Sequence, residues 1–480
     1  MTAPDRPVVL APPAVVHLIG VCGTGMGSLA GLLAAAGFRV TGSDARPYPP
    51  MSTQLAAQGI RVIEGYRPEN LDHAPDLVVV GNVCRIDHSE AAAARERGLR
   101  YASMPRTLHD LFLVGREPLV VAGTHGKTTT TALLAWLLHA AGLDPSVLVG
   151  GVTADFGAGF RLGRGPHFVL EGDEYDSAYF EKRAKFLSYA PRAAVITSVE
   201  HDHVDIYPTW EAYRAAFTAF AALVDPGPLA VWAGDEAALA AARSARCAVV
   251  RYAVEGDPGP AADWVAVSTD VDGGFDLLVD GRAAGRFRSA LAGRHNLRNT
   301  LAALILGHLA AGVPLARLAE VLPGFGGVAR RQQVIGRPRG VTVYDDFAHH
   351  PTAVRETLAA LRPRHERLLA AFEPRSATAC RGTHQRAYAA AFDGTALAVI
   401  APVGRDLPPD ERLDTARLAA DIADRGVPAV AARDLDEVVE VLARHARPGD
   451  GVALLSNGSF GGVGPRLLEA LERGKMEGST

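Results

Sequence analysis

Short apolar runs alternate with longer amphipathic stretches along most of the chain. Near the N-terminus this pattern predicts strands at residues 15–19, 39–41 and 77–80, with a helix through Leu33 after the first strand. Strands that alternate with helices are typical of a parallel sheet covered by helices. We therefore expect a parallel α/β domain that ends near residue 114.

The same alternation continues in a second segment and then changes. Strands are predicted at 119–122, 167–170 and 193–197, and a helix at 128–141. Between Trp264 and Arg288, short β-like runs are instead separated by Asp272-Gly273-Gly274 and Asp280-Gly281. These residues supply the positive φ angles of hairpin turns, so an antiparallel edge on a mixed sheet is expected.

Turn-forming residues separate this segment from the last one. Gly324-Phe325-Gly326-Gly327 and Arg337-Pro338-Arg339-Gly340 predict a flexible boundary. Alternation then returns, with strands predicted at 341–344, 368–372, 397–401 and 452–455 and helices at 352–361 and 415–424. This is the pattern of a doubly wound domain.

Together these patterns predict an α/β protein of three domains, in agreement with a length of 480 residues. We expect an N-terminal Rossmann-like domain at 1–114, a central P-loop ATPase-type domain with a mixed sheet at 115–328, and a C-terminal Rossmann-like domain at 329–480. The first dozen residues are expected to form a loose tail. The N-terminal apolar stretch is preceded by Asp5 and interrupted by Pro12 and Pro13, so it lacks the continuous apolar segment of a signal peptide or membrane span.

Composition excludes several functional classes. Hydrophobic residues make up 48% of the chain and charged residues 21%, which is ordinary for a globular protein. The formal net charge is -4, and the sequence contains no run of basic residues. Neither nucleic acid nor a membrane is therefore an expected partner. The four cysteines are far apart, which predicts neither a disulfide framework nor a zinc knuckle and fits a cytoplasmic location. The sequence does not indicate an oligomeric state.

The first candidate for chemistry is the segment Gly123-Thr124-His125-Gly126-Lys127-Thr128, between a predicted strand and a predicted helix. Backbone N–H groups at such a turn and the positive end of the helix bind phosphate, a lysine adds a cation, and a threonine hydroxyl can reach Mg²⁺. A complete Walker pattern would have glycine in place of Val121. A plain glycine-rich turn is the alternative.

Acidic clusters follow the next two buried strands. Glu171 opens the first cluster, at the strand end where the Mg²⁺ of a nucleotide needs an oxygen ligand, although a surface acidic turn would have the same sequence. The second cluster contains His201, Asp202 and His203, and His203 is a candidate metal ligand. Two histidines do not make a three-ligand zinc site, so Mg²⁺ is preferred; a solvated polar turn is the alternative.

A second glycine-rich turn, from Gly20 to Gly27, follows the first strand, and Asp44 ends the next strand. This arrangement is similar to a dinucleotide-binding turn, but Ser28 stands where a third glycine or alanine belongs. The turn predicts a ligand with a pyrophosphate and a ribose, either NAD or a UDP-sugar. Gly23, Thr24 and Asp44 are its candidate contacts.

Further polar residues lie where open α/β sheets bind ligands. Asn296 and Asn299 share one helical face and can contact adenine or cap the helix. Arg330 and Arg331 lie at the junction with the predicted third domain, and either can reach a transferring phosphoryl group or simply be solvated. Asp346 and His349 follow one strand of that domain, and Arg375 follows the next.

Together these motifs resemble the Mur ligase family over nearly the whole chain, because Gly-Thr-x-Gly-Lys-Thr replaces the ordinary Walker loop in that family and so accounts for Val121. The resemblance implies catalytic roles for Lys127, His203 and Arg331. It implies that Thr128 and Glu171 hold one Mg²⁺ and that His203 helps to hold a second. His349 and Arg375 are our candidates for substrate contact. It further implies that ATP is held by Gly123, Thr124, Gly126, Lys127, Thr128, Thr129, Asn296, Asn299, Arg331 and Asp346.

Within the family, the segments Asp173-Glu174-Tyr175-Asp176 and Phe347-Ala348-His349-His350 resemble the branch that joins the murein tripeptide L-alanyl-gamma-D-glutamyl-meso-diaminopimelate to UDP-N-acetylmuramate in cell-wall recycling. The branch that adds L-alanine is the rival, and it typically has Glu-Ser-Asp and Tyr-Gly-His-His there. Several family members carry a carbamylated lysine where this chain has Phe217. The branches that accept UDP-N-acetylmuramate itself typically lack that lysine.

The resemblance therefore implies an ATP-dependent ligase that works through an acyl phosphate. Two hypotheses from other classes use part of the same sequence. A nicotinamide dehydrogenase would use the first glycine-rich turn, and a nucleotide-switched interaction module would use the phosphate loop without forming a bond.

Overall fold

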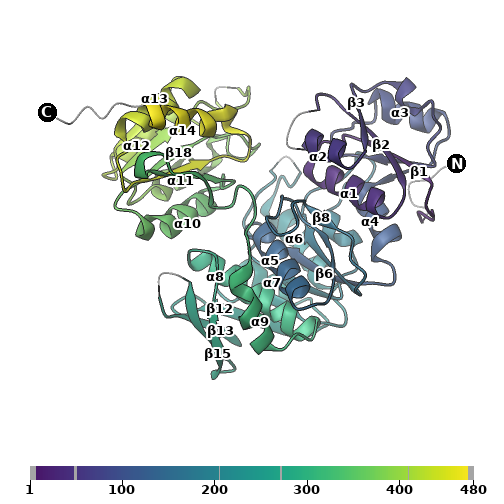
Figure 1. Cartoon of the computed structure of the whole chain (residues 1–480), viewed down its shortest axis with the longest axis horizontal. Helices are drawn as coiled ribbons and strands as arrows, with labels where there is room; N and C mark the ends of the chain where they lie inside the picture. The colour runs from purple at the N-terminus through teal and green to yellow at the C-terminus, as the bar shows by residue number, and fades with distance from the viewer. Residues whose placement is uncertain (1–6, 48–50, 205, 271–272, 409, 474–480) are drawn as a thin grey trace.

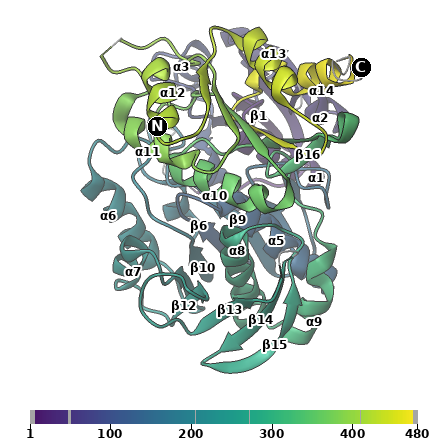
Figure 2. The same ribbon diagram turned by 90° about the vertical axis from the view of Figure 1, so that its left-hand side faces the viewer.

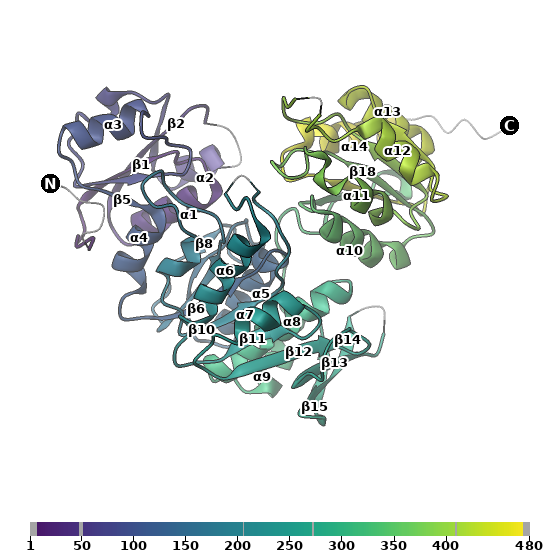
Figure 3. The same ribbon diagram turned by 180° about the vertical axis from the view of Figure 1, so that it is seen from behind.

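The computed structural model describes residues 7–47, 51–204, 206–270, 273–408 and 410–473. The strands of this part of the chain form three sheets, which lie in three lobes (Figure 1). Figures 1 and 3 show both outer lobes on the same side of the central lobe. The predicted α/β fold of three domains is confirmed.

The N-terminal lobe contains a parallel sheet in the order β3-β2-β1-β4-β5. Its strands are β1 (Val15–Ile19), β2 (Arg39–Asp44), β3 (Arg61–Glu64), β4 (Leu77–Val80) and β5 (Tyr101–Ser103), and its helices are α1 (Thr24–Ala35), α2 (Met51–Ala57), α3 (Ser89–Glu96) and α4 (Met104–Leu108). The chain crosses to opposite sides of β1, so the glycine-rich turn after β1 lies at the switch point of the sheet, where such folds bind ligands.

The central lobe contains a mixed sheet in the order β15-β14-β13-β12-β11-β10-β6-β9-β7-β8. Its strands are β6 (Glu117–Ala122), β7 (Ser146–Leu148), β8 (Phe160–Arg161), β9 (His167–Gly172), β10 (Ala193–Ile196), β11 (Leu229–Trp232), β12 (Val249–Val254), β13 (Trp264–Ser268), β14 (Gly274–Val279) and β15 (Arg282–Arg288), and its helices are α5 (Lys127–Ala140), α6 (Trp210–Ala221), α7 (Glu236–Ala242), α8 (Arg294–Ile305) and α9 (Leu315–Val321). β13, β14 and β15 pair antiparallel, which confirms the predicted edge; Asp272 of its first predicted turn lies outside the described residues.

The C-terminal lobe contains a sheet in the order β16-β17-β21-β18-β19-β20, parallel except at the edge strand β16. Its strands are β16 (Gln333–Gly336), β17 (Thr342–Asp346), β18 (Leu368–Phe372), β19 (Leu397–Ile400), β20 (Ala429–Ala431) and β21 (Gly451–Leu455), and its helices are α10 (Pro351–Leu361), α11 (Gln385–Ala391), α12 (Thr415–Ala423), α13 (Leu435–His445) and α14 (Val463–Arg473). Figure 2 shows α10 facing α8 of the central lobe.

Packing joins the lobes unequally. One hydrophobic cluster contains buried residues of both the N-terminal and the central lobes, including Leu29 and Phe168. The two clusters of the C-terminal sheet draw their buried residues, within the described ranges, from that lobe alone. The first two lobes therefore share a core, whereas the third has its own and can move as a unit.

Gly31 on α1 is one point where this shared core is tightest. A Cβ atom at Gly31 would lie 2.1 Å from Cε1 of Phe160 on β8. Gly31→Ala is therefore expected to lower the free energy of unfolding by about 1–3 kcal/mol, because the added carbon overpacks the interface. Denaturant unfolding followed by circular dichroism measures this. At Gly382 the nearest atom would be 3.8 Å away, so Gly382→Ala is the control, and equal effects of the two variants would contradict the prediction.

One local expectation is wrong, and one strand was not predicted. The predicted loose tail is ordered from residue 7: Val8 is buried, and its N–H donates to Asp110 at 2.7 Å, whereas residues 1–6 lie outside the described residues. The strand that was not predicted is β16, which lies within the turn-rich stretch and pairs with β17. Both differences arise because tertiary partners, which the local pattern does not show, supply the order. None of the described helices is long and apolar enough to cross a membrane.

Candidate active site

The phosphate loop follows β6 and leads into α5, and both of its glycines are required by geometry. Gly123 and Gly126 have φ angles of 132° and 80°. A Cβ at Gly123 would lie 2.0 Å from Oγ1 of Thr197, and one at Gly126 would lie 2.4 Å from Oδ1 of Asn299. Val121, by contrast, is buried within β6 and pairs with Glu171 of β9, so the strand continues where a Walker loop would begin.

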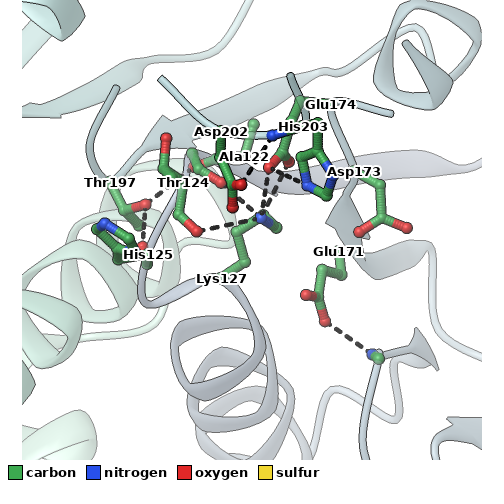
Figure 4. A network of polar contacts seen from close by, with 12 residues as sticks. Ala122, Thr124, His125, Lys127, Glu171, Asp173, Glu174, Thr197, Asp202 and His203 are labelled. Atoms are coloured by element: carbon green, nitrogen blue, oxygen red, sulfur yellow. Dashed lines mark hydrogen bonds and ion pairs between the residues drawn. The ribbon is translucent and has the colours of Figure 1, made fainter. Parts of the chain in front are cut away.

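Lys127 extends from the first turn of α5 into a group of carboxylates (Figure 4). Its ammonium group lies 2.9 Å from Oε2 of Glu174 and donates to the carbonyl of Gly123 at 2.7 Å. Burial alone would lower the pKa of Lys127, but Glu174 and Asp173 outweigh burial and raise it. Lys127 is therefore a permanent cation directed toward the loop that would hold phosphate.

Glu171 lies on the opposite side of Lys127 from His125 (Figure 4), and its carboxylate pairs with the hydroxyl of Thr128. The Thr128 hydroxyl donates to Oε1 of Glu171 at 2.9 Å, and the N–H of Gly150 donates to Oε2 at 2.7 Å. Burial, followed by the charge of Asp173, raises the pKa of Glu171. A carboxylate whose charge is destabilised in this way gains stability from a bound cation, and two hard oxygen atoms suit Mg²⁺.

The C-terminal lobe reaches this centre through Arg331. The Arg331 guanidinium donates to Oγ1 of Thr128 at 3.1 Å and lies 4.8 Å from the centre of the Phe347 ring. Two further contacts cross the same boundary: Thr352 donates to Glu200 at 2.8 Å, and Thr378 donates to Asp202 at 2.7 Å. Arg330 instead pairs with Asp345 at 3.2 Å, within its own lobe.

His203 lies beside the buried carboxylate of Glu174. It adopts a φ of 51°, and its Nε2 lies 3.3 Å from Oε1 of Glu174. Burial would lower the pKa of His203, but Glu174 and Asp202 outweigh burial and raise it. In this arrangement His203 is a second partner of Glu174, near Lys127, and Figure 4 shows it away from Glu171.

The residues expected at the nucleoside lie beside the phosphate loop but already have partners. On α8, the Asn299 amide donates to Oδ1 of Asn296 at 3.1 Å, and the Asn296 amide donates to the carbonyl of Ala292 at 2.7 Å. Asp346 ends β17 and accepts hydrogen bonds from the N–H groups of Gln332 and Ala348, at 2.7 and 2.8 Å. A nucleoside would have to exchange some of these contacts.

A cavity of about 360 Å³ lies between the N-terminal and central lobes. Gly23, Thr24 and Asp44 line it from the first lobe, and Tyr175 and Lys185 line it from the second. Asp44 accepts a hydrogen bond from the N–H of Cys22 at 2.9 Å, which fixes the turn. The lining residues therefore include a cation, Lys185, that could face a pyrophosphate.

His349 and Arg375 lie after β17 and β18, which flank β21 in the C-terminal sheet. The carboxyl ends of these parallel strands meet at one sheet edge. His349 Nδ1 lies 3.0 Å from the carbonyl of Phe347, and Arg375 lies 3.7 Å from Glu373 with its side chain 47% exposed. Both residues thus lie at one edge, and Arg375 is accessible to a ligand.

Sequence reasoning missed three residues that the structure brings into the site. Glu174 is only 1% exposed and contacts both Lys127 and His203. Asp202 accepts a hydrogen bond from Thr378 of the C-terminal lobe. Lys185 pairs with Asp173 at 3.1 Å and stacks over Tyr175 at 4.1 Å. Glu174 and Asp202 were visible as members of acidic clusters after strands. Only the tertiary structure distinguishes them, through the burial of Glu174 and the contact of Asp202 with Thr378.

Glu174→Gln is expected to lower the free energy of unfolding by about 3 kcal/mol at pH 7, because the buried Lys127 cation loses its carboxylate. Burial would raise the pKa of Glu174, but Lys127 and His203 outweigh it and lower the pKa from 4.5 to about 2. A carboxyl group with a lowered folded pKa stabilises the fold above its ordinary pKa, and this contribution is lost as pH falls through the folded value.

The wild-type advantage over Glu174→Gln should therefore shrink as pH falls from 4.5 toward 2. Denaturant unfolding across this range measures the difference. The surface variant Glu69→Gln serves as the control, with an expected effect within about 0.5 kcal/mol at every pH. A wild-type advantage that stays constant with pH would contradict the assigned ion pair.

Comparison with known proteins gives consistent matches to each lobe. Family models described as Mur ligase family, catalytic domain; Mur ligase middle domain; and Mur ligase, glutamate ligase domain match residues 15–114, 121–307 and 330–458. The chain is 37% identical to the UDP-N-acetylmuramate--L-alanyl-gamma-D-glutamyl-meso-2,6-diaminoheptandioate ligase of Escherichia coli, over 95% of this chain and 98% of the relative.

Two further similarities are to proteins of the two candidate activities, the addition of L-alanine and the ligation of a murein peptide. The UDP-N-acetylmuramate--L-alanine ligase of Kineococcus radiotolerans is 38% identical over 95% of this chain and 96% of its own. The crystal structure of a murein peptide ligase from Psychrobacter arcticus superimposes with a TM-score of 0.72 at 34% identity, covering 96% of this chain and 99% of that one. Percent identity alone does not separate the two activities.

Proposed function

Because the chain belongs to the Mur ligase family, and is therefore an ATP-dependent ligase, we propose that it joins L-alanyl-gamma-D-glutamyl-meso-diaminopimelate to UDP-N-acetylmuramate. The observation that carries this proposal is that Tyr175 and Phe347 depart from the residues typical of the branch that adds L-alanine. The 37% identity to the E. coli enzyme of that name, which extends over 98% of the relative, agrees with it.

Family membership excludes the two hypotheses from other classes. A nicotinamide dehydrogenase would leave the phosphate loop and its carboxylates without a role. An interaction module without bond-forming activity would leave the cavity at the first glycine-rich turn unexplained. A role in peptidoglycan recycling and a cytoplasmic location belong to the same proposal.

The proposed reaction has two steps, both between substrate atoms. The lactyl carboxylate of UDP-N-acetylmuramate attacks the γ-phosphorus of ATP and displaces ADP. The amino group of the tripeptide then attacks the acyl phosphate, which forms the amide and releases inorganic phosphate and a proton. No side chain has to form a covalent bond, so catalysis depends on position and charge.

Two protein cations are placed to oppose the charge on the transferring phosphoryl group. Lys127 approaches from the phosphate loop, and Arg331 approaches from the C-terminal lobe through its contact with Thr128. Because they come from different lobes, we propose that both reach the phosphates only while the lobes are in contact.

Thr128 and Glu171 are the proposed Mg²⁺ ligands. Their oxygen atoms are 2.9 Å apart, and the raised pKa of Glu171 shows that the carboxylate lacks a nearby counter-charge sufficient to offset its burial. When bound, Mg²⁺ would supply positive charge to the phosphates. His203 is proposed to assist after its contact with Glu174 is exchanged.

Water must be excluded from this site, because an acyl phosphate hydrolyses in water. The C-terminal lobe has its own hydrophobic clusters, and it contacts the central lobe near the phosphate loop through Arg331, Thr352 and Thr378. We propose that this lobe carries the tripeptide, at His349 and Arg375, and closes over the intermediate.

The UDP part of the acceptor is proposed to occupy the cavity between the N-terminal and central lobes. Gly23, Thr24 and Asp44 would contact the nucleotide, and Lys185 would face its pyrophosphate. Because these two lobes share a core, the acceptor would sit on a rigid platform while the third lobe moves.

The decisive experiment offers both amino substrates to one enzyme. Purified protein is incubated with ATP, Mg²⁺ and UDP-N-acetylmuramate, with either tripeptide or L-alanine, and products are identified by mass spectrometry. Amide formation with tripeptide at a kcat/KM at least about 100-fold above that with L-alanine is expected. Preference for L-alanine would establish the rival activity, and phosphate release without amide would refute the proposed reaction.

A further inference from the structure

Three potential ligands lie together at the far side of the phosphate loop from Glu171: His125, Glu200 and His350. Their donor atoms all lie within 4.8 Å of one another. The Nε2 atom of His125 is 3.1 Å from Oε2 of Glu200, and Nδ1 of His350 is 3.4 Å from the same oxygen. Figure 4 shows His125 and Glu171 on opposite sides of Lys127, so this cluster is separate from the proposed Mg²⁺ ligands.

The cluster is assembled from both sides of a lobe boundary. His125 belongs to the phosphate loop, and Glu200 lies in the loop after β10, both in the central lobe. His350 precedes the first residue of α10 in the C-terminal lobe. The three side chains are therefore neighbours only when the two lobes are in contact.

His350 is buried without the hydrogen bonds that a buried imidazole needs. It is only 7% exposed, and neither of its ring nitrogens has a hydrogen-bond partner among the residues that the structure describes. Buried polar groups are nearly always satisfied, so an unsatisfied one requires an explanation. A neutral imidazole offers the lone pair of one ring nitrogen to a metal.

Glu200 is fixed in orientation by a residue of the other lobe. Thr352 donates to Oε2 of Glu200 at 2.8 Å. A hydrogen bond of this kind, to a ligand rather than to the metal, orients metal ligands in known sites.

The donor set and its spacing suit zinc rather than magnesium. Tetrahedral zinc with bonds of about 2.0 Å places neighbouring donors about 3.3 Å apart. The two distances to Oε2 of Glu200, 3.1 and 3.4 Å, bracket that spacing. Two imidazoles and one carboxylate, with a fourth position left for water, are borderline donors that favour zinc, whereas magnesium prefers oxygen.

We propose that His125, Glu200 and His350 form a binding site for a zinc-class divalent cation, which joins the phosphate loop to the C-terminal lobe. The bound ion would satisfy the imidazole of His350 and hold the lobe boundary in the closed arrangement. The inference does not depend on the substrates of the ligase.

The test uses full-length, tag-free protein freed of metal with a chelator and kept in excess Mg²⁺. Co²⁺ replaces zinc and reports tetrahedral coordination through its visible absorption. We expect an absorption band that saturates at a single equivalent of Co²⁺ and is displaced by Zn²⁺. Glu200→Gln and His350→Gln, one ligand from each lobe, should each weaken Co²⁺ binding at least about 100-fold, and Thr352→Val about 10-fold, since it loses only an orienting contact.

His445→Gln is the matched control, because His445 is an exposed histidine at the end of α13, and its Co²⁺ affinity should equal that of the wild type. Thermal unfolding of each variant checks its fold, and Thr352→Val keeps all three ligands if a ligand variant fails to fold. Absence of the band in the wild type, or its survival in either ligand variant, would overturn the proposal. Ligase activity is measured separately, so an inactive protein that shows the band would refute the proposed function alone.

Discussion

Lys127→Ala is expected to reduce kcat for amide formation about 1,000-fold, because it removes a buried cation aimed at the transferring phosphoryl group. The Lys127 side chain is 11% exposed, and its ammonium group contacts the Gly123 carbonyl at 2.7 Å, so it is held at the loop. Charge stabilisation that develops in the transition state appears in kcat rather than in substrate binding. Steady-state kinetics with ADP release as the signal measures the loss.

Two comparisons make this result specific. Lys182→Ala removes a lysine that is 67% exposed and pairs with Asp176, and its kcat is expected to stay within about 2-fold of the wild type. Circular dichroism must show that the Lys127→Ala protein is folded, because the substitution removes the ion-pair partner of the buried Glu174 carboxylate. A folded Lys127→Ala protein that retains a tenth of the activity would contradict the assigned role.

Arg331→Ala is expected to reduce kcat by a similar factor, about 1,000-fold, although Arg331 lies outside the phosphate loop. Its guanidinium reaches Thr128 from the C-terminal lobe, at 3.1 Å. The variant therefore loses both a cation at the phosphates and a contact that holds the lobes together. We expect a smaller effect on ATP affinity, because Lys127 and the backbone of the loop remain.

Arg331→Lys distinguishes charge from geometry. Lysine keeps the charge but not the planar fork of donors, so partial recovery is expected, to about a tenth of the wild-type kcat. Arg337→Ala, an exposed arginine in the same segment, is the control and should be nearly neutral. Equal loss from Arg331→Ala and Arg331→Lys would point to packing against Phe347 rather than to phosphate contact.

The elements that the sequence placed well are those whose local pattern and tertiary environment agree. β1, β4 and β6 lie in the parallel interiors of their sheets, where both faces are buried, so they form continuous apolar runs. Where order depends on a distant partner, prediction failed. Val8 is held by Asp110, which is 102 positions away, and β16 is held by its ladder with β17.

The candidate site shows the same division. Gly126, Lys127 and Thr128 are adjacent in sequence, so the spacing of the loop suffices to place a cation and a hydroxyl at a helix start. In the sequence, Glu174 looks like the other acidic residues of its cluster. Only in the folded chain is it buried in contact with Lys127 and His203. The contact of Asp202 with Thr378 joins residues 176 positions apart, and no local pattern predicts it.

The sequence by itself determined the α/β class, the positions of several buried strands and a few helices, the phosphate loop and the family. It could do so because apolar periodicity, glycine placement and short motifs are properties of neighbouring residues. Only the tertiary structure decided that Arg331 meets Thr128, that His203 faces Glu174, and that His125, Glu200 and His350 converge. These depend on how separate lobes pack, because charge and coordination act through space over a few ångströms and are insensitive to distance along the chain.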